Sequence, residues 1–331
     1  MNRISVIGAG NWGTVLALLL HKKGREVSLW VYDPDQARAM LETHENPFLP
    51  GYALPPDMAI TTSLAESVEG ADAVVFVVPS KGAASTARGL RECLPSGVPL
   101  VTASKGLDAE TGLTMSQMFE SLLGGRNPVL ALSGPNIAAE IAKGVPTATV
   151  IASEDEAAAH EVQNLFVTPS LRVYTNTDII GVELAGALKN IIAIAAGICD
   201  GMGFGDNTKA ALLTRGLAEI TRLGIRIGAQ QATFMGLAGI GDLIVTCASP
   251  ISRNHRVGIG LGQGRKLADV LDEIGQVAEG VPTTRAAYAL AQKHGVPMPI
   301  TEQVHQVLFE DKDPHAALHD LMTREPKDEV W

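Results

Sequence analysis

Three glycines near the N-terminus have the spacing of a turn that binds dinucleotides. Gly8, Gly10 and Gly13 form a Gly-x-Gly-x-x-Gly motif. We expect a short apolar strand, residues 4–7, before the motif and an apolar helix, residues 14–20, after it. Gly8 permits a tight turn, Gly10 lets the backbone approach a pyrophosphate, and Gly13 lets the helix pack closely on the strand. The first N–H groups of the helix would then face the phosphates, so the motif predicts a dinucleotide site.

A carboxylate completes this pattern. Asp33 lies about 20 residues beyond Gly13, at the end of an apolar segment that spans residues 26–32. A carboxylate at that place can accept a hydrogen bond from a ribose hydroxyl of a bound nucleotide. The alternative is that Asp33 only caps the helix that we expect over residues 35–43.

Lys189 is the candidate for proton transfer in the second half of the chain. It lies within a helical stretch, residues 181–197, that is apolar around its whole circumference. If partners in a cleft hold its ammonium group, burial lowers the pKa of Lys189, as proton transfer near neutral pH requires. The alternative is a structural lysine whose stem packs on Ala and Ile while its ammonium group reaches water.

A second polar cluster follows at residues 236–256. It combines glycines, which allow close backbone approach, with a carboxylate, hydroxyls, an amide and a guanidinium. Arg253 could bind a phosphate through two hydrogen bonds, and Ser252 and Asn254 would add neutral donors. The alternative is a polar loop in which these side chains only cap a helix.

The elements that position these residues fall into two groups. In the first half, helical segments alternate with apolar runs typical of strands, at residues 4–7, 26–32, 59–61, 73–78, 99–103, 129–132 and 147–152. This alternation predicts an α/β Rossmann domain with a doubly wound parallel sheet over residues 1–178. The Pro-rich stretch at residues 46–56 is expected to be an irregular surface loop. From residue 179 to residue 331 the apolar spacing is helical, which predicts an all-α C-terminal domain.

Composition excludes several kinds of partner. The net charge of −10 argues against nucleic acid or an anionic membrane. The three cysteines are far apart, which fits a reducing compartment and predicts no metal site. We see no charged-then-apolar leader, and the most apolar stretch, residues 191–199, is shorter than the roughly 18 residues that span a bilayer. We therefore expect a cytoplasmic protein without membrane insertion, in which this stretch is a buried helix.

Seven short motifs give the chain a resemblance to a known family. They are Gly-Ala-Gly-Asn-Trp-Gly-Thr (8–14), Phe-Val-Val-Pro-Ser (76–80), Ser-Lys-Gly (104–106), Leu-Ser-Gly-Pro (132–135), Ala-Leu-Lys-Asn-Ile-Ile-Ala (187–193), Gly-Ile-Gly-Asp-Leu (239–243) and Ser-Arg-Asn (252–254). Their types and order resemble the NAD(P)-dependent glycerol-3-phosphate dehydrogenases of the bacterial type. The resemblance covers nearly the whole chain, and it extends to Val-Ala-Glu-Gly-Val (277–281) and Leu-Met-Thr-Arg-Glu-Pro-Lys (321–327).

The resemblance implies an activity and a set of site residues. It implies that the chain interconverts dihydroxyacetone phosphate and sn-glycerol 3-phosphate with NAD(P)H. The glycerol 3-phosphate would supply glycerophospholipid synthesis. Lys189 would be the proton acceptor, Lys105 would polarise the reacting oxygen, and Asp242 would orient Lys189 or a substrate hydroxyl. The implied contacts of the small phosphorylated substrate are Lys105, Gly134, Asn190, Asp242, Thr246, Ser252, Arg253 and Asn254. Besides the three glycines and Asp33, the implied cofactor contacts are Asn11, Trp12, Lys105, Ala138, Arg253, Val277 and Glu279. Trp12 could instead only cap the domain core, and a homodimer is an open possibility.

The choice between NAD and NADP depends on the end of the second expected strand. Bacterial members of the family often carry Arg where this chain has Tyr32, beside Asp33. That arginine favours the 2′-phosphate of NADP, whereas a carboxylate repels it. Arg38 on the next helix could still reach a 2′-phosphate. We therefore expect both cofactors to be used, with a preference for NADH.

Two other functions are open at this point. Another lysine-dependent β-hydroxyacid or ketopantoate-type dehydrogenase would keep Gly8, Gly10 and Lys189, but it has no use for the cluster at residues 252–254. A regulator that binds NAD(H) without turnover would need no lysine inside an apolar helix.

Overall fold

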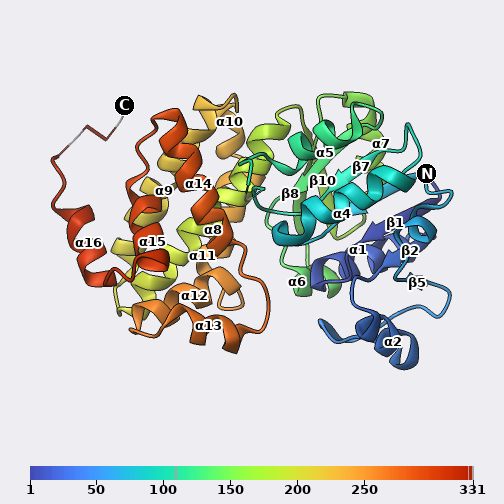
Figure 1. Cartoon of the computed structure of the whole chain (residues 1–331), viewed down its shortest axis with the longest axis horizontal. Coiled ribbons are helices and arrows are strands. Elements are labelled where there is room, and N and C mark those ends of the chain that lie inside the picture. The colour runs from blue at the N-terminus through green and yellow to red at the C-terminus, as the bar shows by residue number, and fades with distance from the viewer. Residues whose placement is uncertain (109, 327, 330–331) are drawn as a thin grey trace.

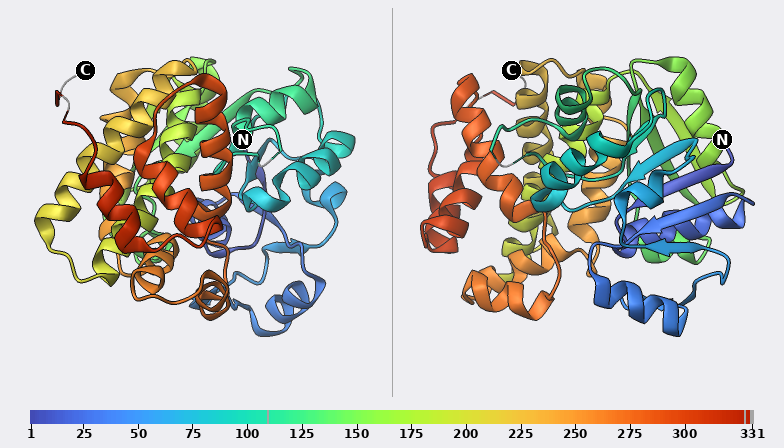
Figure 2. Two further views of the ribbon diagram at one scale, coloured as in Figure 1. Left: turned by 60° about the vertical axis from the view of Figure 1, so that its left-hand side comes forward. Right: turned by 45° about the vertical axis from the view of Figure 1, so that its right-hand side comes forward.

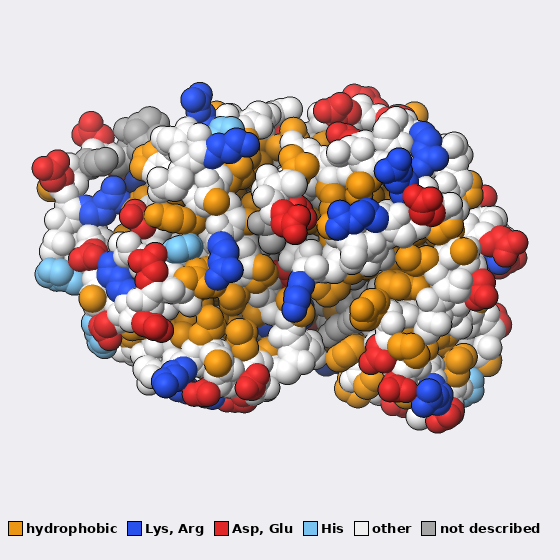
Figure 3. Space-filling view, in the orientation of Figure 1, with side chains coloured by type: hydrophobic (Ala, Val, Ile, Leu, Met, Phe, Trp, Pro, Cys, Tyr) orange, Lys and Arg blue, Asp and Glu red, His pale blue; other side chains and the backbone are white. Residues whose placement is uncertain are grey.

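The computed structural model describes residues 1–108, 110–326 and 328–329, and it consists of two halves (Figure 1). The N-terminal half is a sheet with helices, and every regular element of the described residues after residue 176 is a helix. Figure 2 shows the two halves side by side from two further directions. In Figure 3, basic and acidic side chains are interspersed over both halves of one face, so that face has no single dominant charge.

Eight strands form the main sheet, in the order β10-β9-β8-β7-β6-β1-β2-β5. Their bounds are Arg3–Ile7 (β1), Glu26–Trp30 (β2), Ala59–Thr61 (β5), Ala73–Phe76 (β6), Leu100–Thr102 (β7), Val129–Ser133 (β8), Thr147–Ala152 (β9) and Leu171–Asn176 (β10). The neighbouring strands β8, β7, β6, β1, β2 and β5 all run parallel to one another. The Rossmann-type α/β sheet predicted from the sequence is confirmed.

Helices cover both faces of this sheet. On β6, Ala73 and Val75 belong to one apolar cluster, whereas Val74 and Phe76 belong to another. Successive side chains of a strand point to opposite faces, so the two clusters lie on the two sides of the sheet. The helices of this half are Asn11–Lys22 (α1), Pro34–Thr43 (α2), Leu64–Val68 (α3), Ser80–Cys93 (α4), Met115–Leu123 (α5), Ala138–Ala142 (α6) and Glu156–Phe166 (α7). Helices α1, α2, α6 and α7 contribute to the first cluster, and α3, α4 and α5 to the second.

The sheet departs from the prediction at its far end. β9 runs antiparallel to β8, and β10, which the sequence reading missed, pairs parallel with β9. The helix between β8 and β9 has only five residues and so spans about 7.5 Å, too short to return along the face of the sheet. β9 therefore starts at the edge where β8 ends and runs in the opposite direction. β10 shows the alternation of buried and exposed residues that marks a strand with one solvated face.

The Pro-rich stretch is not the irregular loop that was predicted. Glu45–Asn46 (β3) and Leu49–Ala53 (β4) form a small antiparallel pair. Pro50 has no N–H to donate, but a strand with a single neighbour leaves alternate backbone groups unpaired, so proline is tolerated there.

The C-terminal half is built around one long helix. Ile179–Gly201 (α8) is followed by Asp206–Arg226 (α9), Gln231–Phe234 (α10), a π-helical turn Leu237–Gly241 (η1), Asp242–Ala248 (α11), Arg253–Gly262 (α12), Leu267–Ile274 (α13), Gly280–His294 (α14), Pro299–Phe309 (α15) and Pro314–Met322 (α16). The expectation of helices after residue 178 holds for the described residues. Lys327, at the end of the C-terminal motif, lies outside them.

Glycines let α8 and α12 pack backbone against backbone. A Cβ on Gly197 would lie 2.0 Å from the carbonyl oxygen of His255, and a Cβ on Gly258 would lie 2.0 Å from that of Ile194. Gly201 and Gly262 show the same closeness one turn further along. This contact holds the first turn of α12 beside the middle of α8.

Two segments have the length and apolar composition of membrane spans. They are Ile179–Gly201 and Gln231–Ala248, so the helix that contains the apolar stretch at residues 191–199 extends well beyond it. Of the most apolar window in α8, 94% is buried inside the protein. α8 is thus the core helix of its half. The prediction that residues 191–199 belong to a buried helix is confirmed.

Candidate active site

The turn after β1 is closed toward the sheet and open on its outer side. Gly8 has a φ of +116°, and a Cβ there would lie 2.6 Å from the carbonyl oxygen of Val77. A Cβ on Gly13 would lie 1.9 Å from the Gly8 carbonyl oxygen. A Cβ on Gly10, which is the N-cap of α1, would have no atom within 4 Å. The open side leaves room for a pyrophosphate against the first N–H groups of α1.

Two polar atoms in the first turn of α1 point to a missing ligand. Asn11 Oδ1 and Trp12 Nε1 are buried and have no hydrogen-bond partner among the described residues. Buried polar groups are nearly always paired, so these two call for a partner from outside the chain. Trp12 also packs against the apolar cluster of the sheet, so its ring has the core-capping role as well. The residues present therefore fit a dinucleotide.

The end of β2 shows Asp33 in a capping role. Asp33 Oδ1 accepts a hydrogen bond from the backbone N–H of Asp35, 2.9 Å away, at the start of α2. Tyr32 beside it is 82% exposed. Arg38 forms an ion pair with Asp35 at 3.1 Å. Capping engages Oδ1, and a ribose hydroxyl would have to use Oδ2.

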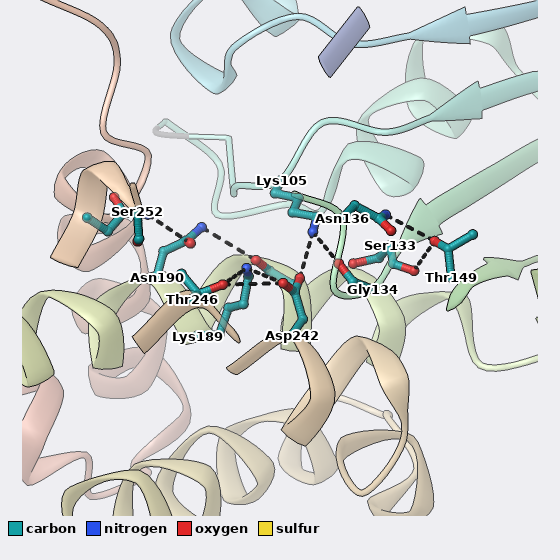
Figure 4. Close-up of polar contacts among 12 residues, drawn as sticks. Lys105, Ser133, Gly134, Asn136, Thr149, Lys189, Asn190, Asp242, Thr246 and Ser252 are labelled. Carbon is teal, nitrogen blue, oxygen red and sulfur yellow. Dashed lines mark hydrogen bonds and ion pairs between the residues drawn. The ribbon is translucent and has the colours of Figure 1, made fainter. Parts of the chain in front are cut away.

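Lys189 is held by partners and does not reach water. Every residue of α8 from 181 to 199 is buried, and Lys189 itself is 4% exposed. Its Nζ donates to Asp242 Oδ1 at 2.6 Å and to the hydroxyl of Thr246 (Figure 4). Burial lowers the pKa of Lys189 to about 8, although the charge of Asp242 opposes this shift. The lysine thus has a proton that it can exchange near neutral pH.

A second lysine binds the same carboxylate from the other half of the molecule. Lys105 follows β7, and its Nζ donates to Asp242 Oδ2 at 2.6 Å and to the Gly134 carbonyl oxygen at 2.9 Å. Figure 4 shows Lys105 and Lys189 pointing at Asp242 from two sides. Asp242 is only 2% exposed. We call Lys105, Lys189 and Asp242 the lysine–aspartate centre.

The π-helical turn before α11 sets the position of Asp242. A Cβ on Gly239 would lie 2.0 Å from the carbonyl oxygen of Phe234, so the turn requires glycine there. Thr246 follows Asp242 by one helical turn, and its hydroxyl lies 3.3 Å from Asp242 Oδ1. The glycines of this segment therefore serve the close backbone approach that the sequence suggested.

The first turn of α12 carries Arg253. Ser252 is the N-cap, and its hydroxyl accepts a hydrogen bond from the His255 N–H at 3.3 Å. Both alternatives for Ser252 are thus compatible, since a capping serine can still face a ligand. Arg253 is exposed and makes no hydrogen bond or ion pair with any described residue. Its guanidinium is available to an anion.

Buried amides join this turn to the centre. Asn254 Nδ2 donates to Asn190 Oδ1 at 2.9 Å, and Asn254 Oδ1 accepts from the Gly280 N–H at 2.9 Å. Asn190 is the neighbour of Lys189 on α8. The amides of Asn190 and Asn254 therefore connect the segment of α8 that carries Lys189 to the Arg253 turn.

The remaining predicted cofactor contacts come from both halves of the molecule. Glu279 precedes α14, and its carboxylate accepts hydrogen bonds from the backbone N–H and the hydroxyl of Ser80. Burial raises the pKa of Glu279, an effect that the Ser80 bonds and the charge of Arg253 oppose. Val277 is 41% exposed, and Ala138 starts α6 against the sheet.

Three polar residues at the carboxyl ends of β6 and β8 were not singled out from the sequence. Ser80 and Ser133 were seen only as letters of motifs, and Asn136 was not considered. Ser133 Oγ and Asn136 Oδ1 are buried and lack partners among the described residues. Asn136 Nδ2 donates to Thr149 at 3.0 Å (Figure 4). Ser80 follows β6, Ser133 ends β8 and Asn136 follows β8. Ligands of α/β sheets bind at the carboxyl ends of the strands, so this position in the sequence could have identified the three residues.

Comparison with known families decides the assignment. The family model described as the N-terminus of NAD-dependent glycerol-3-phosphate dehydrogenase matches residues 3–159, and the model for the C-terminus matches residues 178–319. The chain belongs to the NAD-dependent glycerol-3-phosphate dehydrogenase family. A relative from Geobacter sulfurreducens, glycerol-3-phosphate dehydrogenase [NAD(P)+], is 54% identical over 335 residues, which cover 99% of each chain.

Solved structures agree with this assignment. A glycerol-3-phosphate dehydrogenase from Coxiella burnetii has a TM-score of 0.95 and 40% identity, and the match covers 98% of this chain and 99% of that one. A ketopantoate reductase from Ralstonia eutropha has a TM-score of 0.63 at 16% identity, over 96% of this chain and 100% of that one. That second likeness extends to the fold alone. The chain is thus an NAD(P)-dependent oxidoreductase of the glycerol-3-phosphate dehydrogenase family. Among the described residues, no group of three or more His, Cys, Asp or Glu side chains could hold a metal.

Proposed function

We propose that this chain interconverts dihydroxyacetone phosphate and sn-glycerol 3-phosphate, with Lys189 as the proton-transferring group. The observation that carries the proposal is the lysine–aspartate centre, in which Lys105 of the N-terminal half and Lys189 of the C-terminal half both bind Asp242. The product would serve glycerophospholipid synthesis. When bound, the nicotinamide supplies or accepts the hydride at C2 of the substrate.

The glycine turn and the first turn of α1 would hold the dinucleotide. Gly8, Gly10 and Gly13 shape the space for the pyrophosphate, and Asn11 and Trp12 offer buried polar atoms toward it. Asp33 would bind the ribose. Ala138, Val277 and Glu279 would line the rest of the cofactor site, together with Lys105 and Arg253.

Lys189 moves the proton at the C2 oxygen. In the reduction its ammonium group donates to the oxygen as negative charge develops there, and in the oxidation the neutral amine accepts that proton. A pKa of about 8 makes both forms accessible near neutral pH. Lys105 donates a second hydrogen bond to the same oxygen and stabilises its charge.

Asp242 keeps the two lysines together until the substrate arrives. Each of its oxygens accepts from one lysine at 2.6 Å, so the buried ammonium group of Lys189 and the half-buried one of Lys105 both have a partner. Thr246, which lies on the same helix as Asp242, accepts a second hydrogen bond from Lys189. Asn190 and the backbone of Gly134 complete the substrate wall.

Arg253 binds the phosphate of the substrate. Its free guanidinium, the Ser252 hydroxyl and the Asn254 amide lie on the first turn of α12, whose N–H groups also favour an anion. Binding energy from this non-reacting group then positions the reacting carbon.

Oxidation of NADH with three ketones tests the proposal. We expect fast turnover with dihydroxyacetone phosphate and slow turnover with both dihydroxyacetone and ketopantoate. Faster turnover of ketopantoate would favour the ketopantoate-type alternative. NADH binding without turnover of any ketone would favour a regulator.

Three further features belong to this proposal. We place the domain boundary between residues 178 and 179, where α8 begins. We propose that the enzyme is cytoplasmic. We also propose that it forms a homodimer, and analytical ultracentrifugation would test this oligomeric state.

A further inference from the structure

Ser80 and Glu279 form a contact between the two halves that the proposed mechanism does not use. Ser80 is the first residue of α4 in the coenzyme half, and Glu279 is the N-cap of α14 in the helical half. The Glu279 carboxylate accepts from the Ser80 N–H at 3.1 Å through Oε1, and from the Ser80 hydroxyl through Oε2. Both oxygens of the carboxylate are therefore held by a single residue.

The local structure is shaped around this contact. α4 has no side-chain cap of its own, so the Glu279 carboxylate takes the place of a cap at its positive N-terminal end. A Cβ on Gly106 would lie 2.8 Å from Ser80 Cβ and 3.4 Å from Glu279 Oε2. Gly106, the neighbour of Lys105, thus leaves the space in which the two side chains meet.

Glu279 also connects to the α12 turn. Gly280, the next residue, donates its N–H to Asn254, and Asn254 in turn binds Asn190. The charge of Glu279 acts on Arg253. A shift of Glu279 would therefore change both the contact that we propose between Glu279 and the cofactor and the electrostatic environment of Arg253.

We propose that Ser80 is a positioning residue, which fixes the Glu279 carboxylate across the domain boundary in the place where it contacts the dinucleotide. This inference rests on the proposed function only for the role of Glu279 toward the cofactor. Ser80 itself touches neither substrate nor reacting atoms in this account.

The test is a double-mutant cycle with Ser80→Ala and Glu279→Gln. Ser80→Ala removes the hydroxyl but keeps the N–H, so one of two bonds to a charged group is lost. We expect the Kd of NADH, followed by tryptophan fluorescence, and the KM for NADH to rise roughly five- to twentyfold. kcat should change less than about twofold, because the lysine–aspartate centre is untouched. In the Glu279→Gln background, Ser80→Ala should add little.

Ser85→Ala is the matched control, because Ser85 lies on the same helix and its exposed hydroxyl donates a hydrogen bond to the carbonyl of Gly82 on that helix. It should leave Kd, KM and kcat at wild-type values. An unchanged Kd for NADH in Ser80→Ala would overturn the proposal, as would effects that multiply fully with those of Glu279→Gln. The binding measurement needs no turnover. A wild-type enzyme that binds NADH but does not reduce dihydroxyacetone phosphate would therefore refute the proposed function and still leave the Ser80 test decisive.

Discussion

The lysine–aspartate centre and the α12 turn place their cations in opposite environments. At the lysine–aspartate centre, Lys189 is 4% exposed and bound to Asp242 and Thr246. At the α12 turn, Arg253 is exposed and bound to no described residue. One cation is enclosed within the protein, and the other is left for a ligand.

The difference agrees with the role that we propose for each group. A proton-transfer group needs a shifted pKa, and burial supplies the shift only if a partner such as Asp242 offsets the cost of the buried charge. A phosphate-binding group gains most if it has no internal partner to give up when the ligand arrives. We therefore interpret burial with a partner, at Lys189, as suited to proton transfer, and exposure without a partner among the described residues, at Arg253, as suited to phosphate binding.

The largest effect is expected at the lysine–aspartate centre. Lys189→Met should lower kcat with dihydroxyacetone phosphate by about 10²–10⁴-fold, since it removes a general acid–base group. NADH binding should be nearly unchanged. Stopped-flow turnover and fluorescence titration measure the two quantities, and Lys312→Met, at a surface ion pair with Asp320, is the control. A near-normal kcat would remove the distinction between the two places.

An intermediate effect is expected at the α12 turn. Arg253→Ala should lower kcat/KM for dihydroxyacetone phosphate by about ten- to a hundredfold, because a hydrogen bond to a charged group is worth about 1.5–3 kcal/mol. Discrimination against unphosphorylated dihydroxyacetone should fall in parallel. Arg256→Ala, three residues further along α12 and also exposed, should change neither value. If discrimination persisted in Arg253→Ala, the phosphate would have to bind elsewhere.

The smallest effect concerns the exposed carboxylate at the end of β2. The wild type should use both cofactors and prefer NADH. Asp33→Ser keeps an N-cap for α2 but removes the charge that repels a 2′-phosphate. The ratio of kcat/KM for NADPH to that for NADH should rise about fivefold, since an exposed charge interaction is worth up to about 1 kcal/mol. Asp35→Ser serves as the control, and a wild-type preference for NADPH would contradict this account.

The sequence predicted those parts of the fold that depend on residues close together in the chain. The glycine motif predicted the β1–α1 turn, because Gly8 and Gly13 each leave no room for a Cβ and Gly10 keeps the outer side of the turn open. The direction of β9 was not predictable in the same way, since it depends on the length of α6. The same holds for the pair of strands in the Pro-rich stretch, where the single neighbour of β4 decides whether Pro50 is tolerated.

The site divides along the same line. The apolar helix around Lys189 left its burial open, because only the position of Asp242, 53 residues away, decides between a held and a solvated ammonium group. The Ser80–Glu279 contact joins residues 199 positions apart, and no periodicity reveals such a pair. The roles of the individual site residues are still predictions.

The pH dependence of glycerol 3-phosphate oxidation tests the central claim most directly. Because burial lowers the pKa of Lys189, the neutral amine that accepts the proton forms as the pH rises through about 8. The account predicts that kcat/KM for oxidation rises with pH to a plateau, with an inflection near pH 8, and that the residual activity of Lys189→Met lacks this inflection. An inflection that persists unchanged in Lys189→Met would show that another group transfers the proton.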